Sequence, residues 1–438
     1  MTEPNYKTMG EQQATTPGNR QRTEQDQEHS RDIDDEYPDG GKRAWLTLFG
    51  CFCCFFAALS MMNSVGVYQS WISQHQLKNE TASDIGWIFG FYNFFSFFAG
   101  LPMGPIFDAK GPRVLSLCGA ALLLATYIIL GFCEQYWHFF LCFGLLGSLA
   151  TCMLFTSAIG TVQHWFLRRR GLATGMAISG GSVGGIVSPL ILGALFPKIG
   201  FGWAMRAMAL IMVPFVVVGV CLLRSRLPPS KGSKSSVLPD FRILMAPRMA
   251  ILATGALFIE LGLFIPMTYI TSYATSHGMS TETAYRMVML LNVGSLIGRW
   301  LPGWFGDKLG RFNAQIAALT LCLVSVLAVW LPFGHNTAGL TAFVVLFGLG
   351  SGSGISLVPV CIGQLCKTED YGKTFTAVYS VGSFGSLIGI PLGGQILQAS
   401  HHKYLGLILF VGVAYTIGLA SFIAVRVISV GFAKTSKF

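Results

Sequence analysis

Long runs of apolar residues alternate with short polar segments along most of the chain. A helix needs about 20 mainly apolar residues to cross a lipid bilayer, and twelve runs in this sequence approach or exceed that length. They predict membrane-spanning helices over residues 44–68, 83–105, 113–133, 136–159, 171–195, 203–224, 249–273, 283–302, 313–333, 338–363, 374–398 and 404–428. We therefore expect an all-α membrane protein with twelve transmembrane helices in two pseudo-symmetric six-helix halves.

The longest interior break between apolar runs separates the sixth and seventh. It contains the sequence Pro-Pro-Ser-Lys-Gly-Ser-Lys-Ser-Ser, which is typical of a flexible basic linker. The N-terminal segment is polar and lacks an apolar core, so it is predicted to be disordered rather than a signal peptide. The predicted organisation is an acidic cytosolic tail (1–41), a first half (42–224), a cytosolic linker (225–248), a second half (249–428) and a short cytosolic tail (429–438).

Composition excludes a soluble enzyme. Only 11% of the 438 residues are charged and 52% are hydrophobic, whereas a soluble domain carries about 25% charged residues to cover its surface. The net charge of +10 would favour nucleic-acid binding only if the basic residues formed one face. They fall instead in short loops between the apolar runs, so no nucleic-acid partner is expected and the lipid bilayer is.

The positions of the basic residues predict the orientation. Lys and Arg are concentrated in the tail and in every second loop, and such loops usually face the cytosol. Both termini should then be cytosolic, most simply in the plasma membrane, with the vacuolar membrane as the alternative. Asn79 begins an Asn-Glu-Thr glycosylation sequence, which this orientation places in the first outer loop, where it can be used.

Two loops repeat the same pattern in the two halves. Gly104, Asp108, Gly111 and Arg113 follow the second predicted helix, and Gly303, Gly306, Asp307, Gly310 and Arg311 follow the eighth. Gly175–Pro189 similarly resembles Ala377–Pro391. Duplicated halves of this kind place a substrate site between them and move the substrate by rocking one half against the other. The repeat predicts a secondary transporter for a small molecule.

The two Gly/Asp/Arg loops resemble the signature loops of the major facilitator superfamily. Glycines allow a tight turn, an Asp can lie against a helix N-terminus, and the Arg can pair with it. Pro38-Asp-Gly-Gly41 followed by Trp45, and the His164–Gly175 loop with its basic triplet Arg168, Arg169 and Arg170, are similar to the monocarboxylate transporter family. The closest similarity is to the fungal branch, whose members include vitamin and metabolite transporters and efflux proteins. We expect the triplet to act in topology and gating.

The resemblance assigns one position to the substrate. Arg299 lies four residues before Gly303, the spacing of the family's substrate-binding arginine. Ser295 stands where animal members have an acidic partner, and Asn63 aligns with their proton-handling lysine. The resemblance therefore does not extend to the proton-handling pair.

Two ionisable residues lie within predicted helices, where charge is costly and usually functional. The guanidinium of Arg299 suits a carboxylate; the alternative is that it extends to the nearby membrane surface. Glu260 lies mid-helix, where burial favours the neutral form, so it can take up and release a proton as access alternates. We expect Gly262 and Pro266 to break the helix beside it. A neutral structural Glu is the alternative.

Other polar and aromatic residues are candidates for lining the cavity, although each also fits a helix–helix contact; they are Asn63, Tyr68, Phe264, Tyr269, Asn292 and Tyr379. The segment Gly348–Gly354 is glycine-rich but lies within an apolar run and fits no phosphate-loop spacing, so it predicts close helix packing. No catalytic, ATP-binding or metal-ligand pattern is present, and we expect neither enzyme activity nor a cofactor or metal.

The sequence thus predicts a transporter of a small or medium organic acid or related metabolite, exporting a fungal secondary metabolite. Proton-coupled import of a monocarboxylate or vitamin is the alternative. A non-transporting membrane sensor is a distant third interpretation, because the C-terminal tail is short. Protons are the candidate coupling ion, and partner proteins are left open.

Overall fold

The apolar runs form helices, and no strand occurs in the residues that the structure describes. The structure is a computed structural model that describes residues 39–80, 82–226, 241–400 and 403–430. Most of the predicted tail 1–41, much of the linker 225–248 and the end of the tail 429–438 lie outside these residues.

The helices between Gly41 and Leu222 are called the first half. They are α2 (Gly41–Asn63), α3 (Val65–Gln74), α4 (Ala82–Phe98), α5 (Gly100–Lys110), α6 (Pro112–Leu130), α7 (Tyr136–Phe139), a π-helical segment (Phe140–Gly147), α8 (Ser148–Trp165) and α9 (Arg170–Leu222). The 53-residue α9 contains both the fifth and sixth predicted helices, and it is interrupted at Gly200, where φ is 72° and ψ is 169°. A left-handed residue of this kind is accessible to glycine at little cost.

The helices between Pro247 and Val430 are called the second half. A 3₁₀ turn (Phe241–Met245) precedes α10 (Pro247–Ser276), α11 (Thr281–Leu309), α12 (Arg311–Val324), a π-helical segment (Ser325–Trp330), α13 (Leu331–Phe333), α14 (Thr337–Leu365), a 3₁₀ turn (Thr368–Asp370), α15 (Tyr371–Ala399) and α16 (Leu405–Val430). Ten helical stretches in the described part of the chain are long and apolar enough to cross a membrane. That count takes α9 as one helix, and α11, which carries Arg286 and Arg299, is not among the ten.

The predicted break beside Glu260 is wrong. The helix α10 runs without interruption through Gly262 and Pro266. A proline inside a helix removes one backbone hydrogen bond, a loss that neighbouring helices in a membrane bundle can offset. Gly262 packs directly on the ring of Tyr415 in α16, where an added Cβ would lie 2.9 Å from a ring carbon. Tertiary packing therefore keeps the segment helical.

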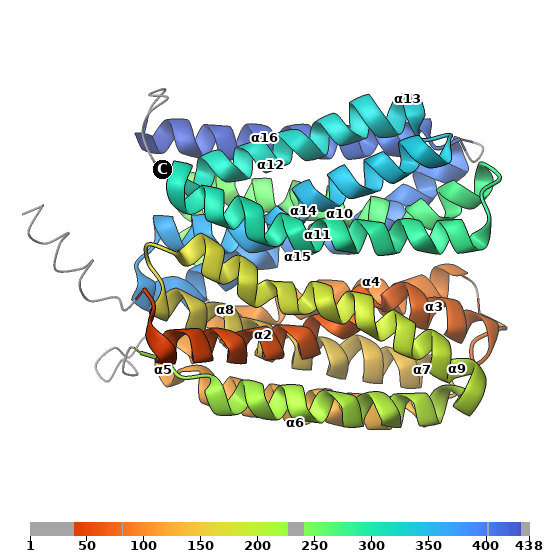
Figure 1. Cartoon of the computed structure of the whole chain (residues 1–438), viewed down its shortest axis with the longest axis horizontal. Helices are drawn as coiled ribbons and strands as arrows, with labels where there is room; N and C mark the ends of the chain where they lie inside the picture. Colours follow the sequence, from red (N-terminus) through yellow and green to blue (C-terminus); the bar gives the residue numbers. More distant parts are fainter. Residues whose placement is uncertain (1–38, 81, 227–240, 401–402, 431–438) are drawn as a thin grey trace, which may run out of the picture. The chain divides into compact units, whose positions relative to one another are not determined.

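Figure 1 shows the helices of the first half (red to green) beside those of the second half (green to violet). Two of the contacts between the halves are related to each other by the sequence repeat, because α5 corresponds to α11 and α15 corresponds to the first part of α9. Helices α4 and α5 pack on α15, and α11 packs on α9. These two interfaces bring the repeated Gly/Asp/Arg loops onto the opposite half.

The glycine-rich segment Gly348–Gly354 packs α14 against α11, as predicted. An added Cβ at Gly348 would lie 2.3 Å from the carbonyl oxygen of Leu291, and one at Gly352 would lie 2.4 Å from that of Ser295. The two backbones therefore approach closer than any side chain would allow, which is the usual role of small residues between membrane helices.

Candidate functional site

Each repeated aspartate caps a helix of the opposite half. The carboxylate of Asp108, near the end of α5, accepts hydrogen bonds from the backbone N–H groups of Gly372 (3.0 Å) and Lys373 (2.9 Å) at the start of α15. These N–H groups have no partner within their own helix, and the helix dipole adds to the attraction for a negative charge. We call this contact the first clamp.

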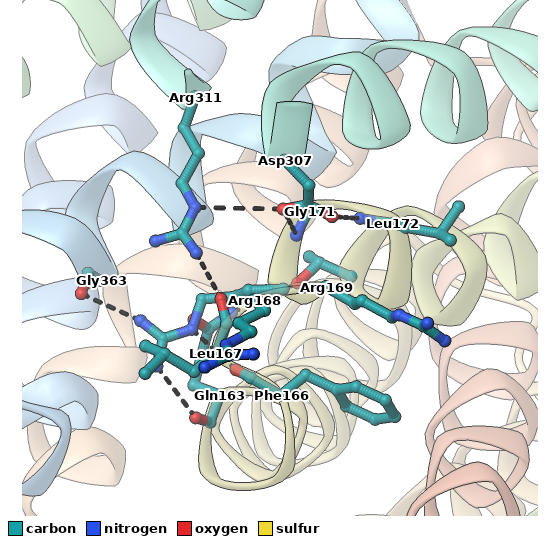
Figure 2. Close-up of polar contacts among 12 residues, drawn as sticks. Gln163, Phe166, Leu167, Arg168, Arg169, Gly171, Leu172, Asp307, Arg311 and Gly363 are labelled. Carbon is teal, nitrogen blue, oxygen red and sulfur yellow. Dashed lines mark hydrogen bonds and ion pairs between the residues drawn. The ribbon is translucent and has the colours of Figure 1, made fainter. Parts of the chain in front are cut away.

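The equivalent aspartate of the second half makes the equivalent contact. Asp307, near the end of α11, accepts hydrogen bonds from the N–H groups of Gly171 (2.8 Å) and Leu172 (2.9 Å) at the start of α9. Figure 2 shows this second clamp together with Arg311, which lies 4.0 Å from Asp307 and donates to the carbonyl oxygen of Leu167. The predicted placement of both aspartates at helix N-termini is confirmed.

Glycines let the helices come close enough for the clamps. An added Cβ at Gly104 would lie 2.3 Å from the carbonyl oxygen of Gly372, and one at Gly303 would lie 2.5 Å from that of Gly171. In both halves the glycine stands four residues before the clamp aspartate. The two clamps are therefore the same structural unit used twice.

The turns after the clamps also need glycine. Gly111 and Gly310 end α5 and α11 with φ of 74° and 102°, a region that residues with a Cβ rarely adopt. The arginines that follow differ in their surroundings, since Arg311 is partly buried at the second clamp whereas Arg113 is exposed. The predicted pairing of the arginine with the aspartate therefore fits Arg311 better than Arg113.

The basic triplet divides into two kinds of residue. Arg168 and Arg169 are exposed, but Arg170 is buried and donates to three carbonyl oxygens. Its acceptors are Phe166 (3.0 Å), Gln163 (3.2 Å) and, across the interface, Gly363 (3.0 Å); Figure 2 shows this contact with Gly363. Arg170 thus adds a third link between the halves at the same end of the helices, which fits the predicted gating element.

Arg299 is buried between the halves rather than extended to the surface. Its side chain is 3% exposed, and its Nη1 donates to the carbonyl oxygen of Ile178 in α9 at 2.7 Å. Its Nε is buried without a hydrogen-bond partner. An unpaired buried donor on a charged group costs about 1–3 kcal/mol or more, so this nitrogen is a suitable donor for an anionic ligand.

Glu260 is buried in α10 close to the backbone of α15, where an added Cβ at Gly382 would lie 3.6 Å from the Cγ of Glu260. A buried carboxylate without a cation beside it is costly, so such a group favours its neutral form. The surroundings fit both a proton carrier and a neutral structural residue.

The other candidate residues do not converge on one point. Asn63 donates to the carbonyl oxygen of Gly181 at 2.8 Å, Tyr269 to that of Ile390 at 2.8 Å, and Asn292 to that of Val288 at 3.1 Å. The first two contacts join neighbouring helices, whereas Asn292 binds the preceding turn of its own helix.

The remaining three are aromatic. Tyr68 is 0% exposed, with its ring against Phe143 and Phe196 inside the first half, and its hydroxyl is without a partner. Phe264 is buried in α10. Tyr379 lies between the halves, with its ring centre 5.5 Å from that of Phe97 in α4.

A pocket lies in the first half, at the end opposite to the clamps. It measures about 640 Å³ and is lined by Gln76, Leu77, Asn79, Glu80, Asp84, Glu134, Gln135, Tyr136 and Trp137. Asn79, the candidate glycosylation residue, is exposed there. The clamp end carries exposed Lys110, Arg113, Arg168, Arg169 and Lys308, so we call it the basic end.

Sequence reasoning missed the partners of the clamp aspartates. These partners are backbone N–H groups, which every residue except proline has, so no residue type marks them in the sequence. Only the fact that they lie at matching positions of the two repeats could have indicated them; they belong to Gly171, Leu172, Gly372 and Lys373. Sequence reasoning identified Asp39 only as part of the Pro38–Gly41 motif and missed its role, which is to accept hydrogen bonds from the N–H groups of Leu167, Arg168 and Arg169. At one end the halves are thus joined by charged groups bound to backbone groups, contacts that water can replace when the halves separate.

Comparisons with known proteins agree with this geometry. The sequence profile described as Major Facilitator Superfamily matches residues 50–390. The chain is 34% identical over 431 residues to the riboflavin transporter MCH5 of Saccharomyces cerevisiae, covering 93% of this chain and 82% of that protein. It is 32% identical over 364 residues to the aspyridones efflux protein apdF of Emericella nidulans, covering 83% and 73% of the two chains.

A solved structure shares the fold. The crystal structure of the human organic anion transporter MFSD10 (TETRAN) superposes with a TM-score of 0.67, covering 88% of this chain and 100% of that chain. Sequence identity is 15%, so this similarity supports the arrangement of helices and not a shared substrate.

Proposed function

Because the chain belongs to the Major Facilitator Superfamily, we propose that it exports an organic acid or related small metabolite by alternating access. The protein is a multi-pass membrane transporter for a small molecule, and its relatives are transporters rather than enzymes. The observation that carries the proposal is the pair of reciprocal clamps, because paired contacts that join two repeated halves at one end are what a rocking movement must make and break.

In this proposal the transporter has twelve membrane-spanning helices, arranged in two six-helix halves. The interruption of α9 at Gly200 supports counting it as two helices, and the 29 residues of α11 are long enough to span a bilayer although they carry charges. Added to the other nine stretches, these make twelve. The sequence motifs Pro38-Asp-Gly-Gly41 with Trp45 and His164–Gly175 support membership of the fungal branch of the monocarboxylate porter family.

The basic end faces the cytosol. Exposed Lys and Arg concentrate there, as expected for cytosolic loops, and the acidic pocket with Asn79 then faces outward, where Asn79 can carry a glycan. With both clamps closed, the structure corresponds to the state that is shut on the cytosolic side. The membrane is the plasma membrane in this proposal, with the vacuolar membrane as the alternative.

Arg299 holds the anionic group of the substrate. Its unpaired Nε and its position between the halves support this role, and a guanidinium binds a carboxylate with paired hydrogen bonds. Glu260 carries the coupled proton, since it is buried against α15 and lies in the half that also holds Arg299. Asn63, Asn292, Tyr269 and Tyr379 act mainly in packing the helices around this region.

Export is favoured over import by the outer pocket. Glu80, Asp84 and Glu134 line it, and a field of one sign repels ions of the same sign. Acidic residues at the outer end therefore disfavour the capture of an organic anion from outside. Export also agrees with the efflux relative, whereas the riboflavin relative supports vitamin import as the second candidate.

The test is an untargeted comparison of metabolites in cells and medium after deletion or overexpression of the gene. A compound that accumulates inside the deletion strain and disappears from its medium supports export and identifies the substrate. A compound left unused in the medium would overturn export in favour of import. Flux of the identified compound into proteoliposomes would then exclude a sensor without transport activity.

A further inference from the structure

Asp39 lies directly before α2 and binds the loop between α8 and α9. Its Oδ1 accepts hydrogen bonds from the N–H groups of Leu167 (2.8 Å), Arg168 (2.9 Å) and Arg169 (3.2 Å), and its Oδ2 accepts from Arg168 (3.0 Å). Successive N–H groups that converge on one point form an anion-binding concavity. We propose that Asp39 is a positioning residue of the transport cycle, which holds this loop in the shape that the second clamp requires.

The same loop is bound from its other side by the second half. The N–H of Leu167 donates to Asp39, whereas its carbonyl oxygen accepts from Arg311 of α11. Two residues beyond Arg169, the N–H groups of Gly171 and Leu172 donate to Asp307. One short segment is therefore held between a carboxylate of its own half and the clamp of the other.

The loop has no regular structure that would hold it without Asp39. Residues 166–169 lie between two helices and form neither a helix nor a strand. The corresponding loop of the second half differs, because a 3₁₀ turn (Thr368–Asp370) leads directly into α15. The first-half loop therefore receives backbone hydrogen bonds from a separate segment at a point where the second-half loop forms a turn of its own.

The local conformation at Asp39 supports a dedicated role. Asp39 has φ of 40°, a left-handed conformation that costs about 1–2 kcal/mol for a residue with a Cβ. Such a conformation persists only where surrounding contacts require it. Further along α2, the ring of Trp45 lies edge-on to Phe166 at 5.5 Å, so the start of α2 and the loop are joined at two points.

The contact of Asp39 with the loop lies within the first half, so it moves with that half and does not itself open or close. Its loss would leave three N–H groups without their acceptor and free the loop to change shape. Asp307 and Arg311 would then have to bind a loop that is no longer held in the required conformation. The state closed at the basic end should become less populated, as if the clamp itself had been weakened.

The test measures this population directly. Thr376 is 2% exposed in α15 and packs against Gly100 of the first half, so a Thr376→Cys reporter is alkylated only when the basic end opens. We expect Asp39→Asn to raise the alkylation rate of purified protein about tenfold, the size of one lost charge-assisted hydrogen bond. Glu134→Gln is the matched control, because that carboxylate is exposed at the opposite end of the first half and should leave the rate unchanged.

A double-mutant cycle separates positioning from general destabilisation. If Asp39 acts through the second clamp, Asp39→Asn has little further effect in an Asp307→Asn background, because the clamp is already broken. Additive effects of the two substitutions, or no effect of Asp39→Asn alone, would overturn the proposal. If Asp39→Asn does not yield folded protein, Asp39→Ser, which keeps one acceptor oxygen, is measured by the same criterion. The result does not depend on which substrate is carried.

Discussion

Replacing Gly175 by alanine would put a methyl group where α9 and α11 are in backbone contact. The added Cβ would lie 1.9 Å from the carbonyl oxygen of Arg299, whereas ordinary contact begins at 3.4 Å. The helices must therefore move apart by about 1.5 Å at this level. The hydrogen bond from Arg299 to Ile178 is 2.7 Å long, so a movement of this size breaks it.

The free-energy change follows from these contacts. Overpacking costs about 1–3 kcal/mol. It raises the free energy mainly of the closed state, because the helices separate when the halves rock. One turn away, the second clamp at Gly171 is strained by the same movement. The equilibrium should shift toward opening at the basic end by about 10- to 100-fold, since 1.4 kcal/mol corresponds to a factor of ten.

The assay is alkylation of the Thr376→Cys reporter, with peptides quantified by mass spectrometry. Because the rate follows the population of the open state when opening is fast, the expected increase is about 10- to 100-fold. Gly193→Ala is the matched control, since it lies in the same helix and nothing lies within 4 Å of its added Cβ. The native Cys54, buried in α2, reports general unfolding in the same sample.

A reporter rate in Gly175→Ala equal to that in Gly193→Ala would refute the reasoning, because the approach of α9 to α11 would then not hold the closed state. Equal increases at the reporter and at Cys54 would also refute it, since they would indicate unfolding rather than rocking.

Four further substitutions test the clamps and the substrate region. Asp108→Asn and Asp307→Asn should each raise reporter alkylation about tenfold, the size of one charge-assisted hydrogen bond, and should be additive in free energy because they act at separate interfaces; equal rates in parent and variants would contradict the clamp. Arg299→Lys should keep expression but lose most flux of the identified substrate in proteoliposomes, because lysine lacks the paired donors; unchanged flux would remove Arg299 from the site. Glu260→Gln should abolish stimulation of transport by a proton gradient while leaving exchange of substrate across the membrane, and proton-coupled transport retained in this variant would contradict the role of Glu260.

Much of the clamp could be predicted before the structure because the Gly/Asp/Arg motif occurs in both halves of the sequence. Asp108 and Asp307 occupy matching positions, and an aspartate near a glycine turn is a good partner for a helix N-terminus. Their acceptor roles toward α15 and α9 could not be predicted, because backbone N–H groups look alike in a sequence. The burial of Arg170, in contrast to Arg168 and Arg169, was equally hidden, since nothing in three adjacent arginines shows that the third begins α9 while the first two lie in the loop before it.

The sequence by itself determined that this is a helical membrane protein with a duplicated design, because the length of each apolar run and the repetition of motifs are local properties. It also marked Arg299 and Glu260, since ionisable residues within apolar runs are costly wherever they lie. Only the tertiary structure decided that α10 continues through Gly262 and Pro266, that Asp39 binds the α8–α9 loop, and that the two halves are joined at the basic end. Those features arise from contacts between segments far apart in the chain, and such contacts depend on how whole helices pack rather than on any single stretch of residues.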